Sequence, residues 1–219
     1  MYILVTFAII SPMKNLPLLL LSLFIFFSCA ENNSYNSRVL NAGSENESWL
    51  LHGRTYDESR FSPLTDINDS NVGELGLSWS FETGTNRGHE TTPIVVDGMM
   101  FITAPWSVVF ALDAKTGKEI WSFDPEADKA WARNACCDVV NRGVAVWCDH
   151  VVFATIDGRL ISLDKESGEV NWDVLTIDKS KPYTITGAPR IVDGKIIIGN
   201  GGGEFAGWGR FWYQCDTYH

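Results

Sequence analysis

Short apolar stretches, separated by polar residues and turn signals, dominate the chain from residue 94 onward. Residues 94–102 place two apolar runs on either side of Asp97-Gly98, a dipeptide that supplies the positive φ angle a tight hairpin needs. Residues 119–123 alternate as a further strand with Trp121 facing inward. No helical periodicity accompanies these stretches. The pattern predicts units of about four short antiparallel strands.

The strand pattern repeats at a fixed spacing. Residues 109–121 read VFALDAKTGKEIW, and residues 160–172 read LISLDKESGEVNW. Four positions match at an interval of 51 residues: Leu112/Leu163, Asp113/Asp164, Gly117/Gly168 and Trp121/Trp172. Radial repetition of four-stranded sheets is how a β-propeller protects its sheet edges. The predicted fold class is therefore all-β. The spacing favours a propeller over a β-sandwich, in which the similarity would be coincidental.

The first 30 residues form a different, almost wholly apolar segment. From Met13 it has a basic start, an apolar run over residues 16–27, and small residues around Cys29. These are the parts of a secretory signal peptide. We expect residues 1–29 to direct export to the periplasm, with Met13 as the favoured start. A transmembrane anchor is the alternative, and a lipoprotein signal ending at Cys29 would tether the chain to a membrane.

A polar stretch separates this leader from the repeats. Residues 30–47 lack hydrophobic periodicity, so we expect a linker or tether there. The repeat units occupy residues 48–205, in which Cys148 is expected to be a small buried hydrophobe of a strand. Residues 206–219 form a separate tail.

The composition narrows the classes of partner. The chain has 219 residues, a net charge of −10 and nine Trp. An acidic protein is a poor partner for nucleic acid, because a phosphate backbone attracts Lys and Arg surfaces. Exposing a Trp ring is costly, so many of these rings should pack at regular structural positions. We therefore expect no nucleic-acid partner.

The most unusual chemical feature is the pair of adjacent cysteines, Cys136 and Cys137. Neighbouring cysteines can close a strained disulfide ring, which departs from relaxed disulfide geometry. Such a ring would act locally, as a rigid and polarizable plate. The alternative is two unrelated thiols. Arg142 follows shortly after, in the string Asp-Val-Val-Asn-Arg-Gly.

Two other segments combine polar residues with turn formers. Residues 87–93 carry Glu90, and residues 183–189 carry Thr186 just before a strand pattern. A glycine run then ends in Glu204, and glycines let a backbone approach a ligand closely. No Lys-Ser/Thr pair follows this run, which disfavours a phosphate-binding loop.

In this order, the segments and the Leu-Asp-x-x-x-Gly-x-x-x-Trp repeat closely resemble the alcohol dehydrogenases that depend on pyrroloquinoline quinone (PQQ), of the methanol and ethanol dehydrogenase type. The resemblance covers about residues 48–205. It implies an N-terminal fragment of a propeller that has about eight blades in the family. This chain would hold about the first two blades, with Trp79 in the segment that closes the ring.

The resemblance also implies a cofactor site. The residues implied to contact PQQ are Glu90, Cys136, Cys137, Arg142, Thr186, Gly202 and Gly203. The two cysteines would form a disulfide over one face of PQQ. Arg142 would face a quinone oxygen that gains negative charge. Glu204 would ligate Ca²⁺, which polarises the carbonyl that accepts hydride, with a lanthanide as the alternative metal.

The function implied is periplasmic oxidation of an alcohol to its aldehyde by hydride transfer to Ca²⁺-activated PQQ, with electrons passed to a c-type cytochrome. The family's catalytic Asp, its second metal ligand and a stacking Trp lie farther along. We therefore expect no catalytic residue in this chain, and the isolated chain to be inactive. Residues 206–219 depart from the family pattern, which suggests a frameshift or truncated reading frame. The alternatives are a non-catalytic Trp-repeat propeller lipoprotein and a quinoprotein sugar dehydrogenase.

Overall fold

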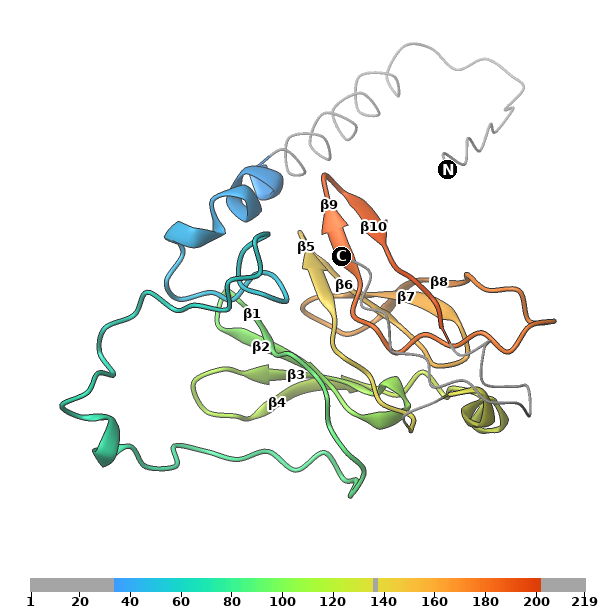
Figure 1. Cartoon of the computed structure of the whole chain (residues 1–219), viewed down its shortest axis with the longest axis horizontal. Coiled ribbons are helices and arrows are strands. Elements are labelled where there is room, and N and C mark those ends of the chain that lie inside the picture. Colours follow the sequence, from blue (N-terminus) through green and yellow to red (C-terminus); the bar gives the residue numbers. More distant parts are fainter. Residues whose placement is uncertain (1–33, 136–137, 202–219) are drawn as a thin grey trace, which may run out of the picture.

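A computed structural model of the chain describes residues 34–135 and 138–201 (Figure 1). The leader expected over residues 1–29, the cysteine pair and the segment from residue 202 to the end lie outside the described residues. The described part is built from antiparallel β-sheets and short 3₁₀ turns. The latter are η1 (Ala42–Ser44), η2 (Val72–Glu74), η3 (Pro105–Ser107) and η4 (Lys129–Asn134).

Two four-stranded sheets follow one another along the chain and lie side by side, as successive blades of a propeller do (Figure 1). The first sheet contains, in spatial order, β1 (Ile94–Val96), β2 (Met99–Thr103), β3 (Val109–Asp113) and β4 (Glu119–Phe123). The second contains β5 (Ala145–Trp147), β6 (His150–Ala154), β7 (Arg159–Asp164) and β8 (Val170–Leu175). A further antiparallel pair consists of β9 (Arg190–Val192) and β10 (Lys195–Ile197). The prediction of all-β units with about four antiparallel strands is confirmed.

The matched Asp and Gly positions form the same turn in both blades. Asp113 accepts a hydrogen bond from the backbone of Thr116, and Asp164 accepts one from Ser167. Gly117 and Gly168 then adopt φ angles of +70° and +73°, which glycine reaches without steric cost. The pairing of the third strand with the fourth also shifts register at matched positions. The shift lies between Ala111 and Leu112 in one blade and between Ser162 and Leu163 in the other. The repeat therefore encodes the turn from the third strand of a blade to its fourth.

Two Trp residues, Trp79 and Trp121, join one unit to the next. The Trp121 ring at the end of the first blade lies on Gly168 of the second, where a Cβ atom would come within 2.7 Å of Trp121 Cδ2. Its indole Nε1 donates to the backbone oxygen of Lys165 at 2.9 Å. Trp79 lies on Gly117 in the same way. The chain around Trp79 thus takes the place, relative to the first blade, that the last strand of a preceding blade would take.

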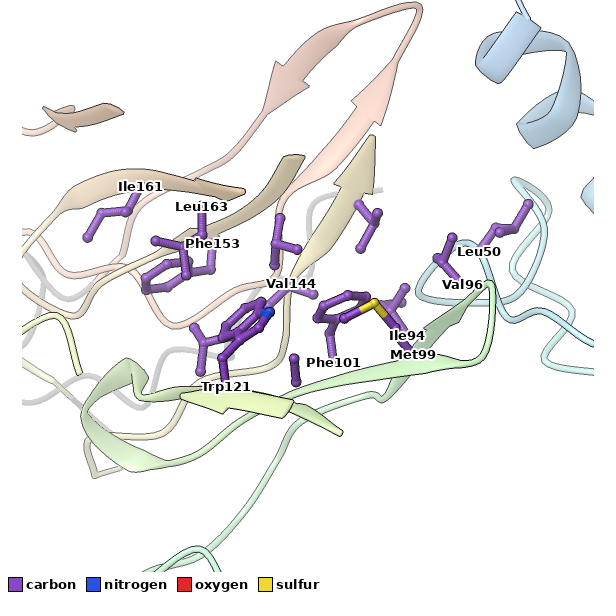
Figure 2. Packing of buried hydrophobic residues seen from close by; sticks show 14 of the residues in the cluster. Leu50, Ile94, Val96, Met99, Phe101, Trp121, Val144, Phe153, Ile161 and Leu163 are labelled. Carbon is purple, nitrogen blue, oxygen red and sulfur yellow. The ribbon is translucent and has the colours of Figure 1, made fainter. Parts of the chain in front are cut away.

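The main core lies between the two blades. Phe101 and Trp121 of the first sheet face Phe153 and Ile161 of the second (Figure 2). The ring centroids of Phe101 and Trp121 are 5.9 Å apart. The strands β1 and β2 bury alternate side chains, as the period of a β-strand predicts, whereas β3, β6 and β7 bury successive residues because both of their faces are covered. This packing fixes the two blades relative to each other, and with them the loops that each blade contributes to the site.

The N-terminal region differs from the linker expected over residues 30–47. Residues 34–40 are helical, and Val39 and Ala42 are buried against the blades. Arg38 forms ion pairs with Glu45 at 2.7 Å and with Asp97 of the β1–β2 turn at 2.8 Å. The helix forms because tertiary contacts stabilise a polar segment whose own propensity is weak. No helix among the described residues is long and apolar enough to cross a membrane.

Cys148 also differs from its prediction. It is the first residue of the turn between β5 and β6, with a φ angle of +52°, and it is half-buried rather than a buried strand residue. Asp97 and Asp193 occupy the same position in their hairpins, with φ angles of +52° and +50°. Turn geometry, and not strand packing, therefore governs this position.

Between the N-terminal helix and β1, residues 60–78 run away from the sheets as an extended, exposed loop (Figure 1). Large apolar side chains are exposed along it: Phe61, Leu64, Ile67, Val72, Leu75 and Leu77. Single exposed apolar residues are ordinary on protein surfaces, but a succession of them in one segment is typical of a surface that contacts other structure.

Candidate functional site

Three segments that are distant in the sequence meet around Arg142. The Arg142 backbone N–H donates to the carbonyl oxygen of Thr186 at 3.0 Å, and its own carbonyl accepts from the Thr92 N–H at 3.1 Å. Gly143 follows with a φ angle of +123°, and a Cβ atom there would lie 3.0 Å from the Thr92 oxygen. Glycine is thus required for the close approach of these two segments.

The side chains of three residues singled out from the sequence converge at this junction. The Arg142 guanidinium forms an ion pair with Glu90, with Nη2 and Oε2 2.7 Å apart. Its Nη1 donates to the Thr186 hydroxyl, also at 2.7 Å. The Arg142 and Glu90 side chains remain 36% and 40% exposed. We call these three residues the Arg142 cluster; its charged groups are preorganised and still accessible to a ligand.

A second ion pair ties the Glu90 segment to the segment that follows the cysteine pair. Arg87 pairs with Asp138, which has a φ angle of +74°. The Arg87 guanidinium also lies over the Trp106 ring, 5.7 Å from its centroid, and Lys129 Nζ lies 4.1 Å from the same centroid. Cationic groups therefore gather around an aromatic ring beside the residues that flank Cys136 and Cys137.

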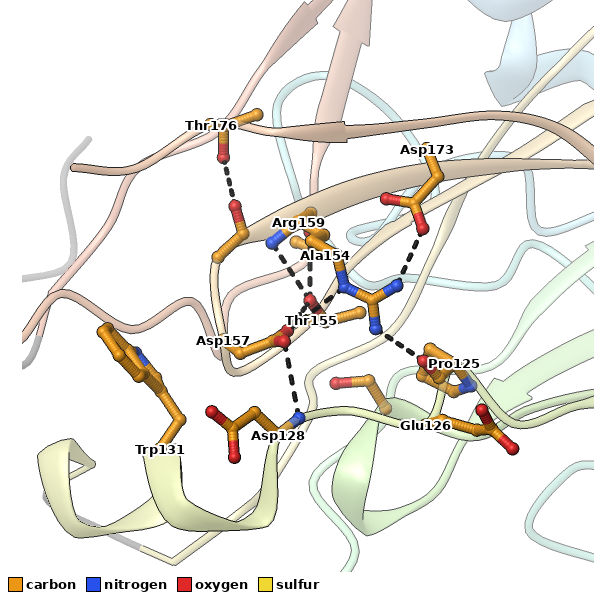
Figure 3. Close-up of polar contacts among 12 residues, drawn as sticks. Pro125, Glu126, Asp128, Trp131, Ala154, Thr155, Asp157, Arg159, Asp173 and Thr176 are labelled. Carbon is orange, nitrogen blue, oxygen red and sulfur yellow. Dashed lines mark hydrogen bonds and ion pairs between the residues drawn. The ribbon is translucent and has the colours of Figure 1, made fainter. Parts of the chain in front are cut away.

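The loop that leads to the cysteine pair is held by a polar network around Asp157 (Figure 3). Asp157 Oδ1 lies 3.5 Å from Arg159 Nε, and its Oδ2 accepts a hydrogen bond from the Asp128 backbone at 3.4 Å. Arg159 also pairs with Asp173 at 2.7 Å. Burial by itself would raise the pKa of the Asp157 carboxyl, but the Thr155 hydroxyl, Arg159 and other groups outweigh it and hold that pKa below its ordinary value.

Trp131 connects this loop to the Thr186 segment. Its indole Nε1 donates to the Tyr183 carbonyl oxygen at 2.7 Å, and Lys179 Nζ lies 4.3 Å from its ring centroid. The loop before the cysteines and the segment before Thr186 are therefore fastened to each other as well as to the blades.

His52 contacts the site at the Thr92 segment. Its Nε2 lies 3.5 Å from the Thr92 hydroxyl, next to the backbone that binds Arg142. Burial, together with the positive charges of Arg190 and Arg60, lowers the pKa of His52 to about 4. The ring is therefore neutral at physiological pH.

Sequence reasoning did not find Asn141, the residue before Arg142. Its amide is buried and donates to Ser107 Oγ at 3.0 Å and to the Ala154 carbonyl at 2.8 Å. Asn141 stands two residues before Gly143, and an Asn at this spacing from a Gly favours a turn. This pattern was the signal that the sequence offered. His52 was also missed, because its partner Thr92 comes from another segment, and Asp157 was missed although Thr155 and Arg159 lie close to it in the sequence.

The remaining site residues of the sequence prediction lie outside the part of the chain that the structure describes. These are Cys136, Cys137, Gly202, Gly203 and Glu204. Within residues 34–135 and 138–201, no group of three or more His, Cys, Asp or Glu side chains is placed to hold a metal ion.

Comparison with known proteins decides which family has this fold and these motifs. The family described as "Glucose/ethanol/alcohol dehydrogenase, beta-propeller domain" matches residues 49–205. The chain belongs to this family. The resemblance recognised in the sequence is thereby confirmed, and membership of a dehydrogenase family disfavours the scaffold alternative.

Several family members are similar over most of this chain. The quinohemoprotein alcohol dehydrogenase ADH-IIG of Pseudomonas putida is 53% identical over 174 residues, which are 79% of this chain and 24% of that protein. The 1-butanol dehydrogenase (cytochrome c) of Thauera butanivorans is 53% identical over 75% of this chain and 23% of its own length. The chain thus spans about a quarter of the curated relatives it matches.

Solved structures agree with the observed fold. The structure of ADHIIG from Pseudomonas putida HK5 superposes with a TM-score of 0.75 at 54% identity, covering 77% of this chain and 25% of that one. A europium-containing methanol dehydrogenase superposes with a TM-score of 0.73 at 38% identity, covering 77% of this chain and 30% of that one. The prediction of a partial quinoprotein propeller is confirmed.

Proposed function

We propose that this chain forms one wall of the PQQ site of an alcohol dehydrogenase that oxidises an alcohol to its aldehyde. The observation that carries the proposal is the Arg142 cluster, in which Glu90, Arg142 and Thr186 converge from three segments. Relatives about half identical to this chain are named alcohol dehydrogenases, and this supports an alcohol rather than a sugar as the substrate class.

The donors of the Arg142 cluster suit PQQ chemically. PQQ carries carboxylates and quinone oxygens, which accept hydrogen bonds and attract positive charge. Arg142 offers a planar guanidinium that stays charged at all physiological pH values, and the Thr186 hydroxyl adds a donor or acceptor. The accessible guanidinium of Arg142 can therefore bind such a group without losing its contact with Glu90.

Each residue has a proposed task. Arg142 attracts the anionic groups of the cofactor, Glu90 holds the guanidinium in place, and Thr186 fixes its second edge. Bound PQQ would supply the two-electron acceptor that takes a hydride from the alcohol. We further propose that Cys136 and Cys137 cover one face of PQQ as a disulfide, that Gly202 and Gly203 approach it closely, and that Glu204 contributes an oxygen ligand to the adjacent metal.

The metal and the electron acceptor are proposed from chemistry and kinship. A carboxylate such as Glu204 suits either Ca²⁺ or a lanthanide, since both are hard cations that prefer oxygen ligands. One relative is named a cytochrome c-linked 1-butanol dehydrogenase, which supports a c-type cytochrome as the acceptor. The apolar leader supports export to the periplasm, with a lipid anchor at Cys29 as a further proposal.

Further blades would complete the site. The chain spans about a quarter of its curated relatives, and the apolar side chains exposed between residues 61 and 77 mark a surface for such blades to cover. We propose that the catalytic base and the other metal ligands belong to those blades. The 219 residues alone would then bind PQQ weakly and oxidise no alcohol.

The test is titration with PQQ and CaCl₂, followed by absorbance and by dye-coupled alcohol oxidation. It is done on this chain and on a longer chain in which later blades follow residue 205. We expect the longer chain to bind PQQ and to be active, and Arg142→Ala to raise its dissociation constant by about tenfold or more. If the longer chain takes up no PQQ, the proposed function is wrong.

The chain offers a matched control for this variant. Arg190 and Glu58 form an ion pair at 2.8 Å whose side chains are 35% and 41% exposed, nearly the values of the Arg142–Glu90 pair. Arg190→Ala therefore removes an equivalent surface pair outside the Arg142 cluster. It should leave the affinity for PQQ unchanged, and an equal loss in both variants would contradict a specific role for Arg142.

A further inference from the structure

Asn141 is a buried polar residue directly beside the accessible Arg142. Its side chain is 1% exposed and belongs to neither blade sheet. Its Nδ2 donates to Ser107 Oγ of the first blade at 3.0 Å and to the Ala154 carbonyl of the second at 2.8 Å. The Asn141 backbone oxygen accepts from the Thr103 hydroxyl at 3.2 Å. A single residue thus joins the ends of two blades.

The same side chain shapes the backbone at Arg142. Asn141 Oδ1 accepts from the Gly143 N–H at 3.0 Å, which closes an Asx turn with Arg142 at its centre. With Asn141 turned inward, Arg142 points toward Glu90 and Thr186. Its backbone N–H and carbonyl are at the same time bonded to Thr186 and Thr92. The direction of the Arg142 side chain is therefore set by bonds made one residue earlier.

We propose that Asn141 is the positioning residue of the Arg142 cluster. Its amide anchors the turn between the two blades, and that anchor holds the Arg142 guanidinium in position to receive an anionic group of the cofactor. The identity of that ligand rests on the proposed function, whereas the positioning of Arg142 does not.

The amide group is the side chain that these partners require. The Ala154 carbonyl can only accept, and the Gly143 N–H can only donate, so a donor and an acceptor are needed on one short side chain. Asp at this position would keep the acceptor but turn a second oxygen toward the Ala154 carbonyl. Leaving a buried group without its partner costs more than the net value of the bond itself.

Amide hydrogen exchange on the 219-residue chain tests the positioning directly, without any cofactor. The probes are the amides of Arg142 and Thr92, and Ile161 in β7 reports on the blade core. We expect Asn141→Asp to accelerate exchange at the first two amides by about tenfold or more and to leave Ile161 unchanged. Uniform acceleration at all three amides, or none at Arg142, would overturn the proposal.

A milder pair of variants keeps the test decisive if Asn141→Asp does not fold. Ser107 and Ser162 are both 0% exposed, and each hydroxyl has one side-chain partner, Asn141 and His150 respectively. Ser107→Ala should accelerate exchange at Arg142, and Ser162→Ala should not. Equal effects of the two substitutions would contradict the proposal.

Binding of PQQ then shows whether Asn141 acts through Arg142. In the longer chain, we expect Asn141→Asp and Arg142→Ala each to raise the PQQ dissociation constant. The double variant should bind no more weakly than Arg142→Ala alone, because the two residues form one unit. Additive losses would show that Asn141 does not act through Arg142.

The proposed function and the proposed positioning role of Asn141 can be refuted independently of each other. If the unsubstituted longer chain binds no PQQ, the proposed function fails, and the exchange rates still decide the positioning of Arg142. If PQQ binds but neither exchange nor affinity responds to Asn141→Asp, the positioning fails and the proposed function stands.

Discussion

The indole of Trp121 lies against Gly168, and its Nε1 donates a hydrogen bond to the Lys165 carbonyl of the same turn at 2.9 Å. The first blade therefore ends in an indole ring, and the second blade has room for this ring because Gly168 has no side chain. Trp79 and Gly117 make the equivalent contact. The Trp–Gly contact therefore recurs in the fold, and substitution of the glycine tests how much it contributes to stability.

Gly168→Ala should lower the free energy of unfolding by about 2–4 kcal/mol, since the new methyl group meets the Trp121 ring and the positive φ angle is strained as well. Gly84→Ala is the matched control, because Gly84 has the same φ angle of +73° and no atom within 4 Å of a Cβ position. It should cost about 1 kcal/mol. Urea unfolding measures both, and equal losses would show that the Trp contact contributes nothing.

Asp157→Asn should destabilise the chain by about 1–2 kcal/mol at neutral pH, because it removes the buried carboxylate that accepts from the Thr155 hydroxyl and pairs with Arg159, while Arg159 keeps its pair with Asp173. The pKa of Asp157 is lowered in the folded state, so its contribution is present above about pH 4 and is lost as the pH falls through the folded pKa. Thermal unfolding between pH 2 and 7 should show a smaller acid loss in the variant.

His52 should contribute a separate pH dependence at a higher pH. Its folded pKa of about 4 lies below the ordinary 6.5, so the unfolded chain binds the proton first as the pH falls. Stability should therefore decline between pH 6.5 and 4, and His52→Gln should flatten that slope. An unchanged slope in His52→Gln would refute the assignment.

Val39→Ala should loosen the N-terminal helix, because Val39 is buried where that helix meets the blades. We expect a loss of about 2 kcal/mol, and faster proteolysis before residue 48. The neighbouring Leu40 is 65% exposed, so Leu40→Ala should change stability by less than about 0.5 kcal/mol. Equal sensitivity of both variants to protease would mean that the helix is not docked.

Local patterns were enough to predict the blades. Asp97-Gly98 forms the expected hairpin turn, and the matched Gly117 and Gly168 supply the positive φ angles of their turns. These features depend on neighbours in the sequence, so the sequence displays them. Cys148 was assigned wrongly, because its apolar character concealed that it occupies a turn position filled by Asp in the other two hairpins.

The N-terminal helix was missed for a different reason. Tyr35, Val39 and Ala42 have the spacing of one helical face, but polar residues surround them and the segment reads as a linker. These three apolar residues are enough to hold the helix only because it packs against the blades. Composition is therefore a poor guide where three apolar residues decide the outcome.

Only the accessible residues of the candidate site could be predicted from the sequence. Glu90, Arg142 and Thr186 lie in motifs that resemble the family, and the structure brings them together. Asn141 acts through Ser107 and Ala154, which lie on different blades, and no single stretch of sequence displays that relation. Buried positioning residues are for this reason harder to recognise than the groups they hold.

The Trp121–Gly168 contact has a consequence for how such a protein can grow. The first blade carries half of a joint at either side: the Gly117 turn receives the Trp79 ring, and Trp121 provides a ring to the next blade. A duplicated stretch that spans both halves fits against its own copy without new substitutions. Gene duplication can therefore lengthen the ring one blade at a time, while the loops at the blade ends diverge to build chemistry.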